Sequence, residues 1–172
     1  MSYKEILPFI TTIILDIDGV LTDGSVEIHP HEEVRTMNAK DGFALRFASR
    51  MGYKIFVISG GNSPSYKEKL IANGVKEVIL NSKNKIQSYE LLKEKYKLSD
   101  EEVMYMGDDI PDYHLMKRVR LGVCPKDAAV EIKAIAAYQS PFGGGRHCVR
   151  DIIEQTMRVQ GKWFNPETYD GE

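Results

Sequence analysis

The sequence TTIILDIDGVLTDG, residues 11–24, runs from a short strand-like segment into two aspartates separated by one residue and followed by a glycine. Residues 11–15 are rich in β-branched and apolar side chains and have the length of a buried strand. Asp16 and Asp18 therefore stand at the carboxyl end of that strand, where α/β folds place their ligands. Alternate residues of an extended segment point the same way, and Gly19 permits the turn that follows, so both carboxylates can face one site.

Four further short apolar runs occur along the chain, each bounded by Gly, Asn, Ser or Asp, and we interpret them as buried strands. They are residues 54–58, 77–80, 103–106 and 121–123. Segments with helix punctuation lie between them, including residues 85–96 and a segment that opens at Ser63-Pro64 and closes at Gly74. This alternation predicts a Rossmann-like α/β fold, a doubly wound parallel sheet with helices on both faces.

Two stretches interrupt the alternation. Residues 25–37 hold two short extended segments around the polar turn HPHEE, which predicts a β-hairpin insertion after the first strand. Residues 140–151 contain Pro141 and three consecutive glycines, and we expect a flexible glycine-rich tail that leads to a C-terminal helix. A chain of 172 residues, 42% of them hydrophobic, has room for one sizeable core, so residues 1–172 are interpreted as a single domain.

The charge balance argues against nucleic-acid binding. The chain has 23 Lys and Arg against 25 Asp and Glu, a formal net charge of −2, and no basic stripe that could follow a phosphate backbone. The N-terminal residues indicate neither a signal peptide nor a membrane span. Cys124 and Cys148 lack a paired C-x-x-C spacing, which favours a reducing compartment. We therefore expect a cytoplasmic protein with no nucleic-acid or membrane partner.

A second group of acids follows the predicted strand 103–106 in the sequence GDDIPD, residues 107–112. If the strands are parallel, these acids reach the same edge of the sheet as Asp16. Clustered carboxylates suit Mg²⁺, which coordinates carboxylates, water and substrate phosphate oxygens and offsets the repulsion between the acids and a phosphate. An alternative remains open at this point, in which Asp108 or Asp109 only caps the helix that opens near Pro111.

A hydroxyl residue and a lysine follow other predicted strands. Ser59 and Gly60 come directly after strand 54–58, and Lys85 opens the predicted helix 85–96. A hydroxyl beside flexible glycines can donate hydrogen bonds to a phosphoryl oxygen, and a lysine supplies positive charge to an anionic transition state. Taken alone, Ser59 could equally be a turn residue and Lys85 a solvated lysine.

The order of these motifs, DxD, hydroxyl, lysine and GDxxxD, resembles that of the haloacid dehalogenase superfamily over residues 16–112. The resemblance implies a magnesium-dependent phosphatase that works through an aspartyl phosphate. It assigns the nucleophile to Asp16, the general acid and base to Asp18, the phosphoryl contacts to Ser59, Gly60 and Lys85, and the metal to Asp16, the backbone carbonyl of Asp18, Asp108 and Asp112. Asp112 would orient a metal-bound water or the lysine.

The motif spacing leaves no room for the cap domain that many members of that superfamily carry. The hairpin, one helix and one strand already fill the interval between Asp16 and Ser59, and a helix and a strand fill that between Ser59 and Lys85. An uncapped site would be open to bulk water, which weakens electrostatic interactions within it. A neighbouring subunit is therefore expected to cover the site.

Four features together resemble the 3-deoxy-D-manno-octulosonate 8-phosphate (KDO 8-phosphate) phosphatases: the run DIDGVLTDG, the hairpin, the segment NAKDG at 38–42, and the glycine-rich tail. This implies a small sugar-phosphate substrate of lipopolysaccharide synthesis and a homotetramer whose neighbouring subunits help to close each site. Arg150 of the tail would bind the substrate carboxylate through its planar fork. Asn62 and the tail sequence GGRHCVRD, residues 144–151, depart from the family pattern.

Two alternatives stay open on the sequence. A phosphatase for nonulosonate 9-phosphates (KDN or N-acylneuraminate) shares the same scaffold. A phosphate-receiver signalling domain also combines an acidic magnesium pocket, a hydroxyl residue and a lysine, but it accepts phosphate on an aspartate after its third strand. This chain has Leu80-Asn81-Ser82 at that place and no acid, which disfavours a receiver.

Overall fold

Strand β1 (Thr12–Leu15), which delivers the first acidic motif, lies inside a six-stranded parallel sheet in the computed structural model, which describes residues 2–31 and 33–171. The strand order is β5-β4-β1-β6-β7-β8. The other strands are β4 (Lys54–Ile58), β5 (Glu77–Ile79), β6 (Val103–Met106), β7 (Leu121–Cys124) and β8 (Tyr138–Gln139). The chain winds outward from β1 to β5 and then returns to the other side of β1, so the sheet is doubly wound, as predicted.

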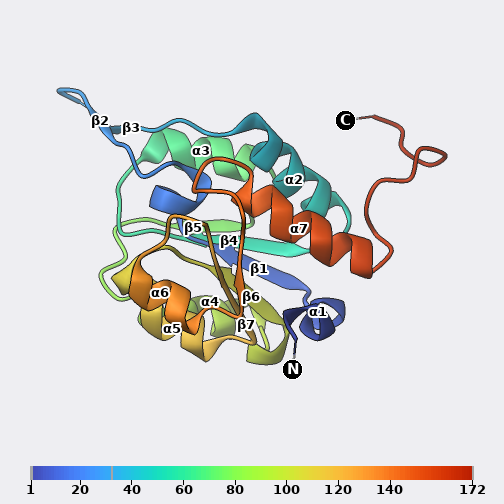
Figure 1. The fold of residues 1–172 in the computed structure, drawn as a ribbon. Helices are drawn as coiled ribbons and strands as arrows, with labels where there is room; N and C mark the ends of the chain where they lie inside the picture. The colour runs from blue at the N-terminus through green and yellow to red at the C-terminus, as the bar shows by residue number, and fades with distance from the viewer. Residues whose placement is uncertain (1, 32, 172) are drawn as a thin grey trace.

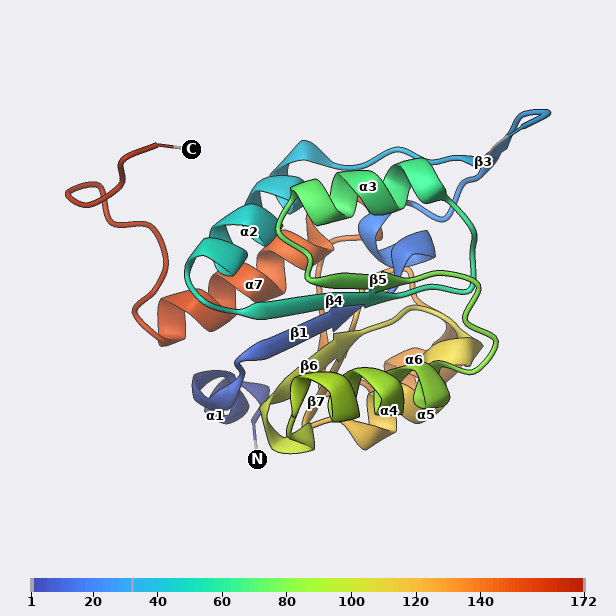
Figure 2. The same ribbon diagram turned by 180° about the vertical axis from the view of Figure 1, so that it is seen from behind.

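Helices cover both faces of this sheet (Figures 1 and 2). On one face lie α2 (Ala39–Arg50), α3 (Pro64–Ala72) and α7 (Cys148–Val159), and on the other α4 (Lys85–Tyr96), α5 (Tyr113–Arg118) and α6 (Val130–Ile135). Successive side chains of β1 point to opposite faces of the sheet and pack into both helical layers. Ile13 and Leu15 belong to one core cluster and Ile14 to the other. Every residue of β1 is buried, as expected for a central parallel strand.

Several short elements complete the chain. Helix α1 (Tyr3–Ile6) precedes β1, and one-turn helical segments occupy Leu7–Phe9, Asp100–Glu102 and Ile110–Asp112. Residues Ile17–Leu21 form a turn whose backbone is not helical at Asp18 and Gly19. No domain is inserted between the elements of residues 2–31 and 33–171, which agrees with the expected absence of a cap. Within the same residues, no helix has both the length and the apolar character needed to cross a membrane.

The predicted hairpin is present and projects from the body of the molecule near α3 (Figure 1). Its antiparallel strands β2 (Glu27–Ile28) and β3 (Glu33–Val34) are two residues long, shorter than the predicted range 25–37. Residue 32 of the predicted turn lies outside the described residues, as do residues 1 and 172 of the predicted domain. Ile28 is 83% exposed on this hairpin.

The glycine-rich segment 140–151 packs against the loop that follows β1. The backbone N–H of Gly145 donates to the carbonyl of Val20 at 2.9 Å, and a Cβ on Gly144 would overlap the carbonyl of Gly19. Asp41 of α2, which is fully buried, accepts backbone N–H bonds from the start of α7. The tail expected to be flexible therefore has defined contacts with the Asp16–Gly19 loop, and its mobility stays a prediction.

Candidate active site

The acids of the first and fourth motifs meet where the winding of the sheet reverses. Strands β1 and β6 are neighbours, so Asp16 and Asp108, which follow them, come together at the carboxyl edge. Oxygen atoms of Asp16, Asp108 and Asp112 all lie within 4.8 Å of one another. The cavity above them has a volume of about 420 Å³. It is lined by Asp16, Asp18, Gly24, Ser59, Gly60, Gly61, Ser82, Lys83, Lys85, Asp108, Asp109, Pro111 and Asp112.

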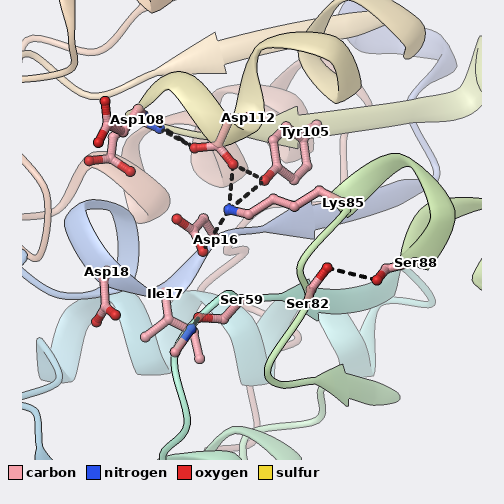
Figure 3. Close-up of polar contacts among 12 residues, drawn as sticks. Asp16, Ile17, Asp18, Ser59, Ser82, Lys85, Ser88, Tyr105, Asp108 and Asp112 are labelled. Atoms are coloured by element: carbon pink, nitrogen blue, oxygen red, sulfur yellow. Dashed lines mark hydrogen bonds and ion pairs between the residues drawn. The ribbon is translucent and has the colours of Figure 1, made fainter.

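Lys85 supplies positive charge to this acidic cluster (Figure 3). It is the first residue of α4, which Asn84 caps through its side chain. Its buried Nζ lies 3.1 Å from Oδ1 of Asp16 and 2.5 Å from Oδ1 of Asp112. Burial disfavours the ammonium charge, but the two carboxylates outweigh it and raise the pKa of Lys85 above its ordinary value. Lys85 is therefore a cation held between two carboxylates.

Asp112 is fixed by contacts on both of its oxygens. Oδ2 accepts backbone N–H bonds from Asp108 at 2.9 Å and from Asp109 at 3.2 Å. Oδ1 accepts the hydroxyl of Tyr105 and faces Lys85. A Cβ at position 107 would overlap the Asp112 carboxylate, so glycine is required there. These contacts place Asp112 between the Asp108 loop and Lys85, and its role in orienting Lys85 or a metal-bound water stays a prediction.

The cluster carries more negative charge than its protein partners balance. Burial raises the pKa of Asp16 to about 7, although Lys85 opposes this rise. Burial, followed by repulsion from Asp16, raises the pKa of Asp108 to about 8. Oδ1 of Asp108 is buried and has no hydrogen-bond partner among the residues that the structure describes. An orphaned carboxylate oxygen beside two other carboxylates fits a divalent cation with a preference for hard oxygen ligands.

Asp18 lies apart from this cluster, and Figure 3 shows its carboxylate turned away from Asp16 and Lys85. The pair of residues Asp18 and Gly19 forms the sharp turn after β1, with φ of 85° at Gly19. A Cβ on Gly19 would overlap the Asp108 carboxylate, so glycine is needed both for the turn and for the approach of the two loops. Asp18 instead pairs with Arg35 of the hairpin, at 2.6 Å between Nε and Oδ1.

Ser59 and its glycines line the other wall of the cavity. The Ser59 side chain is buried, and its Oγ accepts the backbone N–H of Gly61 at 3.2 Å, which leaves the hydroxyl proton free to be donated. Ser82 of the neighbouring loop and Ser88 of α4 share a hydrogen bond at 2.7 Å (Figure 3). Asp109, which also lines the cavity, accepts the backbone N–H of Ile110 and so caps the following helical turn.

Arg150 is the predicted site residue that the structure does not bring to the cavity of its own chain. Its Nε donates to Glu154 at 3.2 Å. The guanidinium lies over the rings of Phe43 and Trp163, with 5.6 and 5.4 Å between Cζ and the ring centroids. It lines a separate cavity between α2 and α7, together with Lys40 and others. Arg150 is not among the residues that line the cavity at Asp16, and its contact with substrate stays a prediction.

Two residues that contact the site were missed by the sequence analysis. Tyr105 lies within the predicted strand 103–106 and was not assigned to the site, yet its hydroxyl donates to Asp112. A signal was available, since a tyrosine fully buried next to an acidic motif needs a partner for its hydroxyl. Arg35 gave no such signal, because its pairing with Asp18 depends on how the hairpin folds back.

Comparison with known proteins agrees with this geometry. A family model described as haloacid dehalogenase-like hydrolase matches residues 69–143. The 3-deoxy-D-manno-octulosonate 8-phosphate phosphatase KdsC of Escherichia coli K12 is 31% identical over 154 residues, which cover 89% of this chain and 82% of that protein.

Solved structures show the same likeness. The crystal structure of the corresponding phosphatase from Yersinia pestis gives a TM-score of 0.89 at 26% identity, covering 92% of this chain and 86% of that one. A phosphatase of the same description from Moraxella catarrhalis, solved with a magnesium ion, a phosphate ion and a KDO molecule, shares the fold with a TM-score of 0.88 at 22% identity, covering 92% and 91%.

The parallel sheet and the acidic cluster at its carboxyl edge, together with these matches, define a phosphatase of the haloacid dehalogenase-like class. Within that class, the chain belongs to the family of 3-deoxy-D-manno-octulosonate 8-phosphate phosphatases. A receiver domain is excluded by this membership.

We expect Tyr105→Phe to lower both stability and turnover. The change removes a buried hydroxyl donor to Asp112, at a cost of about 1 to 3 kcal/mol in the free energy of unfolding, because the acceptor is charged. Turnover should fall several-fold because Asp112 positions Lys85. Urea unfolding and steady-state phosphate release measure the two effects.

Tyr89→Phe is the matched control, since Tyr89 is also buried and donates to an aspartate, Asp100, that lies outside the cavity. It should lose stability and keep its turnover. An equal loss of turnover in both variants would show that the Tyr105 hydroxyl acts on stability alone.

Proposed function

We propose that this phosphatase hydrolyses KDO 8-phosphate to KDO and inorganic phosphate through a phosphorylated Asp16. The observation that carries the chemistry is the buried contact of Asp16 with Lys85, next to the orphaned oxygen of Asp108. The substrate is proposed from the family, because the relatives named above act on KDO 8-phosphate. A nonulosonate 9-phosphate is the alternative substrate.

Asp16 acts as the nucleophile in this proposal. Its carboxylate is held at the end of a rigid central strand beside Lys85, which contacts Oδ1, and one of its oxygens attacks phosphorus. As the new bond forms, the bond from phosphorus to the sugar oxygen breaks. Lys85 and the Ser59 hydroxyl stabilise the phosphoryl oxygens during this transfer.

Asp18 moves the protons in both steps. In the first step its carboxyl group donates a proton to the departing sugar oxygen, and in the second its carboxylate removes a proton from the water that attacks the phosphorylated Asp16. The bond between phosphorus and the Asp16 oxygen then breaks, which releases inorganic phosphate and restores the carboxylate. Asp18 is 30% exposed and lines the cavity, so it can reach a substrate oxygen there.

Magnesium is the proposed cofactor. Asp16, Asp108 and the backbone carbonyl of Asp18 would hold it, with Asp112 next to them. When bound, it supplies positive charge that favours ionised carboxylates and neutralises the phosphoryl oxygens. The raised pKa values of Asp16 and Asp108 support this proposal, because a bound cation would favour their ionised forms.

A homotetramer is part of the proposal, because the cavity has no cap among the described residues. The projecting hairpin, residues 25–37, would cover the site of a neighbouring subunit, and Arg150 would bind the substrate carboxylate there. The exposed Ile28 on the hairpin supports a role in such an interface. A cytoplasmic location accords with the two free, buried cysteines.

The substrate proposal predicts a preference that steady-state kinetics can measure. With magnesium present, kcat/KM for KDO 8-phosphate should exceed that for a nonulosonate 9-phosphate, and that for p-nitrophenyl phosphate, by about tenfold or more, or about 1.4 kcal/mol in transition-state binding. A panel of phosphate esters assayed by phosphate release tests this. A preference for the nine-carbon substrate would select the alternative, and equal values for all esters would contradict recognition of a sugar acid.

The metal proposal predicts that substitutions of Asp108 and Asp109 have different effects on the magnesium requirement, although the two residues are neighbours in sequence. Activity should vanish with a chelator and return with magnesium. Asp108→Asn should raise the magnesium concentration for half-maximal activity by about tenfold or more, because it alters a proposed ligand. Asp109→Asn is the matched control and should shift this concentration little, since Asp109 lines the cavity but caps a helical turn and is not a proposed ligand. Full activity in chelator, or equal shifts in both variants, would contradict the assignment.

A further inference from the structure

Arg35 makes the most direct contact between the hairpin and the catalytic aspartates. It follows β3 directly, and its side chain is only 3% exposed. Nε donates to Oδ1 of Asp18 at 2.6 Å and Nη2 donates to Oδ2 at 3.0 Å. This is a bidentate pair, the arrangement in which an arginine fixes both the position and the plane of a carboxylate.

The surroundings of the pair are built to accommodate it. Nη2 also donates to Glu33 at 3.0 Å. A Cβ on Gly61 would lie 2.8 Å from Nη2 of Arg35 and 3.0 Å from Oδ2 of Asp18, so a side chain there would crowd both partners. The loop after β4, the loop after β1 and the hairpin therefore converge on this one contact.

Stability is a weak explanation for this contact. Nη1 of Arg35 is buried and has no hydrogen-bond partner within the described part of the chain. Burying a guanidinium with an unsatisfied donor is costly, and buried ion pairs contribute little net stability even when fully satisfied. A pair retained at such a cost, on a residue that lines the catalytic cavity, points to a role in the chemistry.

We propose that Arg35 is a positioning residue that orients Asp18 for proton transfer. This inference rests on the proposed function of Asp18 as general acid and base. Phosphoryl transfer is in line, so the sugar oxygen leaves on the side of phosphorus opposite the attacking Asp16 oxygen. A proton donor for that oxygen must be held away from Asp16, and Figure 3 shows the Asp18 carboxylate turned away from Asp16. Arg35 holds Asp18 in this place through Nε.

The pair leaves Asp18 able to exchange protons. A carboxylate offers about four lone-pair sites, and the two bonds from Arg35 use two of them. The exposed part of Asp18 faces the cavity, so the remaining sites can serve the sugar oxygen in the first step and water in the second. Arg35 itself exchanges no proton, because arginine stays protonated in proteins.

The inference predicts that Arg35→Gln is selective for the leaving group. An alkyl oxygen needs a proton when it departs, whereas p-nitrophenolate does not. We expect kcat/KM for the best sugar phosphate to fall about 30-fold or more, a large part of the roughly 10²- to 10⁴-fold that general acid catalysis contributes, and kcat/KM for p-nitrophenyl phosphate to fall less than about threefold. Arg35→Lys should resemble Arg35→Gln, because an ammonium cannot form the bidentate pair.

The second chemical step gives an independent readout. Loss of an oriented base should slow hydrolysis of phosphorylated Asp16, so rapid mixing of Arg35→Gln with p-nitrophenyl phosphate should show a burst of nitrophenolate close to one equivalent per site. The control is Arg118→Gln, which removes an exposed arginine that contacts Glu90 and Asp100 far from the cavity. It should show neither the selective loss nor the burst.

Combination with Asp18→Asn separates this inference from the proposed function. If Arg35 acts through Asp18, adding Arg35→Gln to Asp18→Asn should produce no further loss on the sugar phosphate. A loss by the same factor in both backgrounds, or equal losses on sugar and aryl phosphates, would overturn the positioning role while leaving Asp18 as the acid. Normal turnover of Asp18→Asn would instead refute the proposed function. Circular dichroism and urea unfolding test the folding of every variant independently of turnover.

Discussion

Repulsion among three clustered carboxylates, two of them buried, is the constraint on which the rest of this site depends. Asp16, Asp108 and Asp112 meet in a space where water cannot fully solvate them, and burial raises the pKa of the first two toward neutrality. One ammonium, that of Lys85, enters the cluster. The carboxylates thus carry more negative charge than Lys85 balances, which is expected of a site that binds a cation together with a phosphate ester.

The fold meets this constraint through rigid elements. The sheet brings the ends of β1 and β6 side by side, and α4 begins with Lys85 in the same place. Glycine at two positions lets the backbone approach the carboxylates, since a Cβ on Gly19 or Gly107 would overlap them. The contacts of the glycine-rich tail with the loop after β1 add a further support. Preorganised charges of this kind need no rearrangement when the transition state forms.

Local sequence predicted most of this arrangement. Helix α4 and strands β4 and β6 have the predicted bounds, because apolar runs and caps encode them within a few residues. The two-residue strand β8 was missed, since two residues carry no periodicity. The motif order predicted that Asp16, Lys85 and Asp108 lie close together, because the topology of a parallel sheet brings the ends of its strands to one edge.

The parts that escaped prediction are those that depend on tertiary folding. Arg35 reaches Asp18 only because the hairpin folds back over the loop after β1, and no local pattern records this. Arg150 was expected at the substrate, but the turn into α7 directs it to Phe43 and Trp163 within its own chain. Its proposed role depends on a second subunit, which the sequence of one chain does not position.

The central claim is that phosphate passes through Asp16, and acid quenching of a single turnover tests it most directly. Enzyme mixed with a limiting amount of ³²P-labelled substrate and magnesium should carry a transient label, which proteolysis and mass spectrometry would locate on Asp16. Asp16→Asn should carry no label and release no phosphate, because an amide is not an anionic nucleophile. Full turnover with no labelled protein at any time, or appreciable phosphate release by Asp16→Asn, would contradict the account.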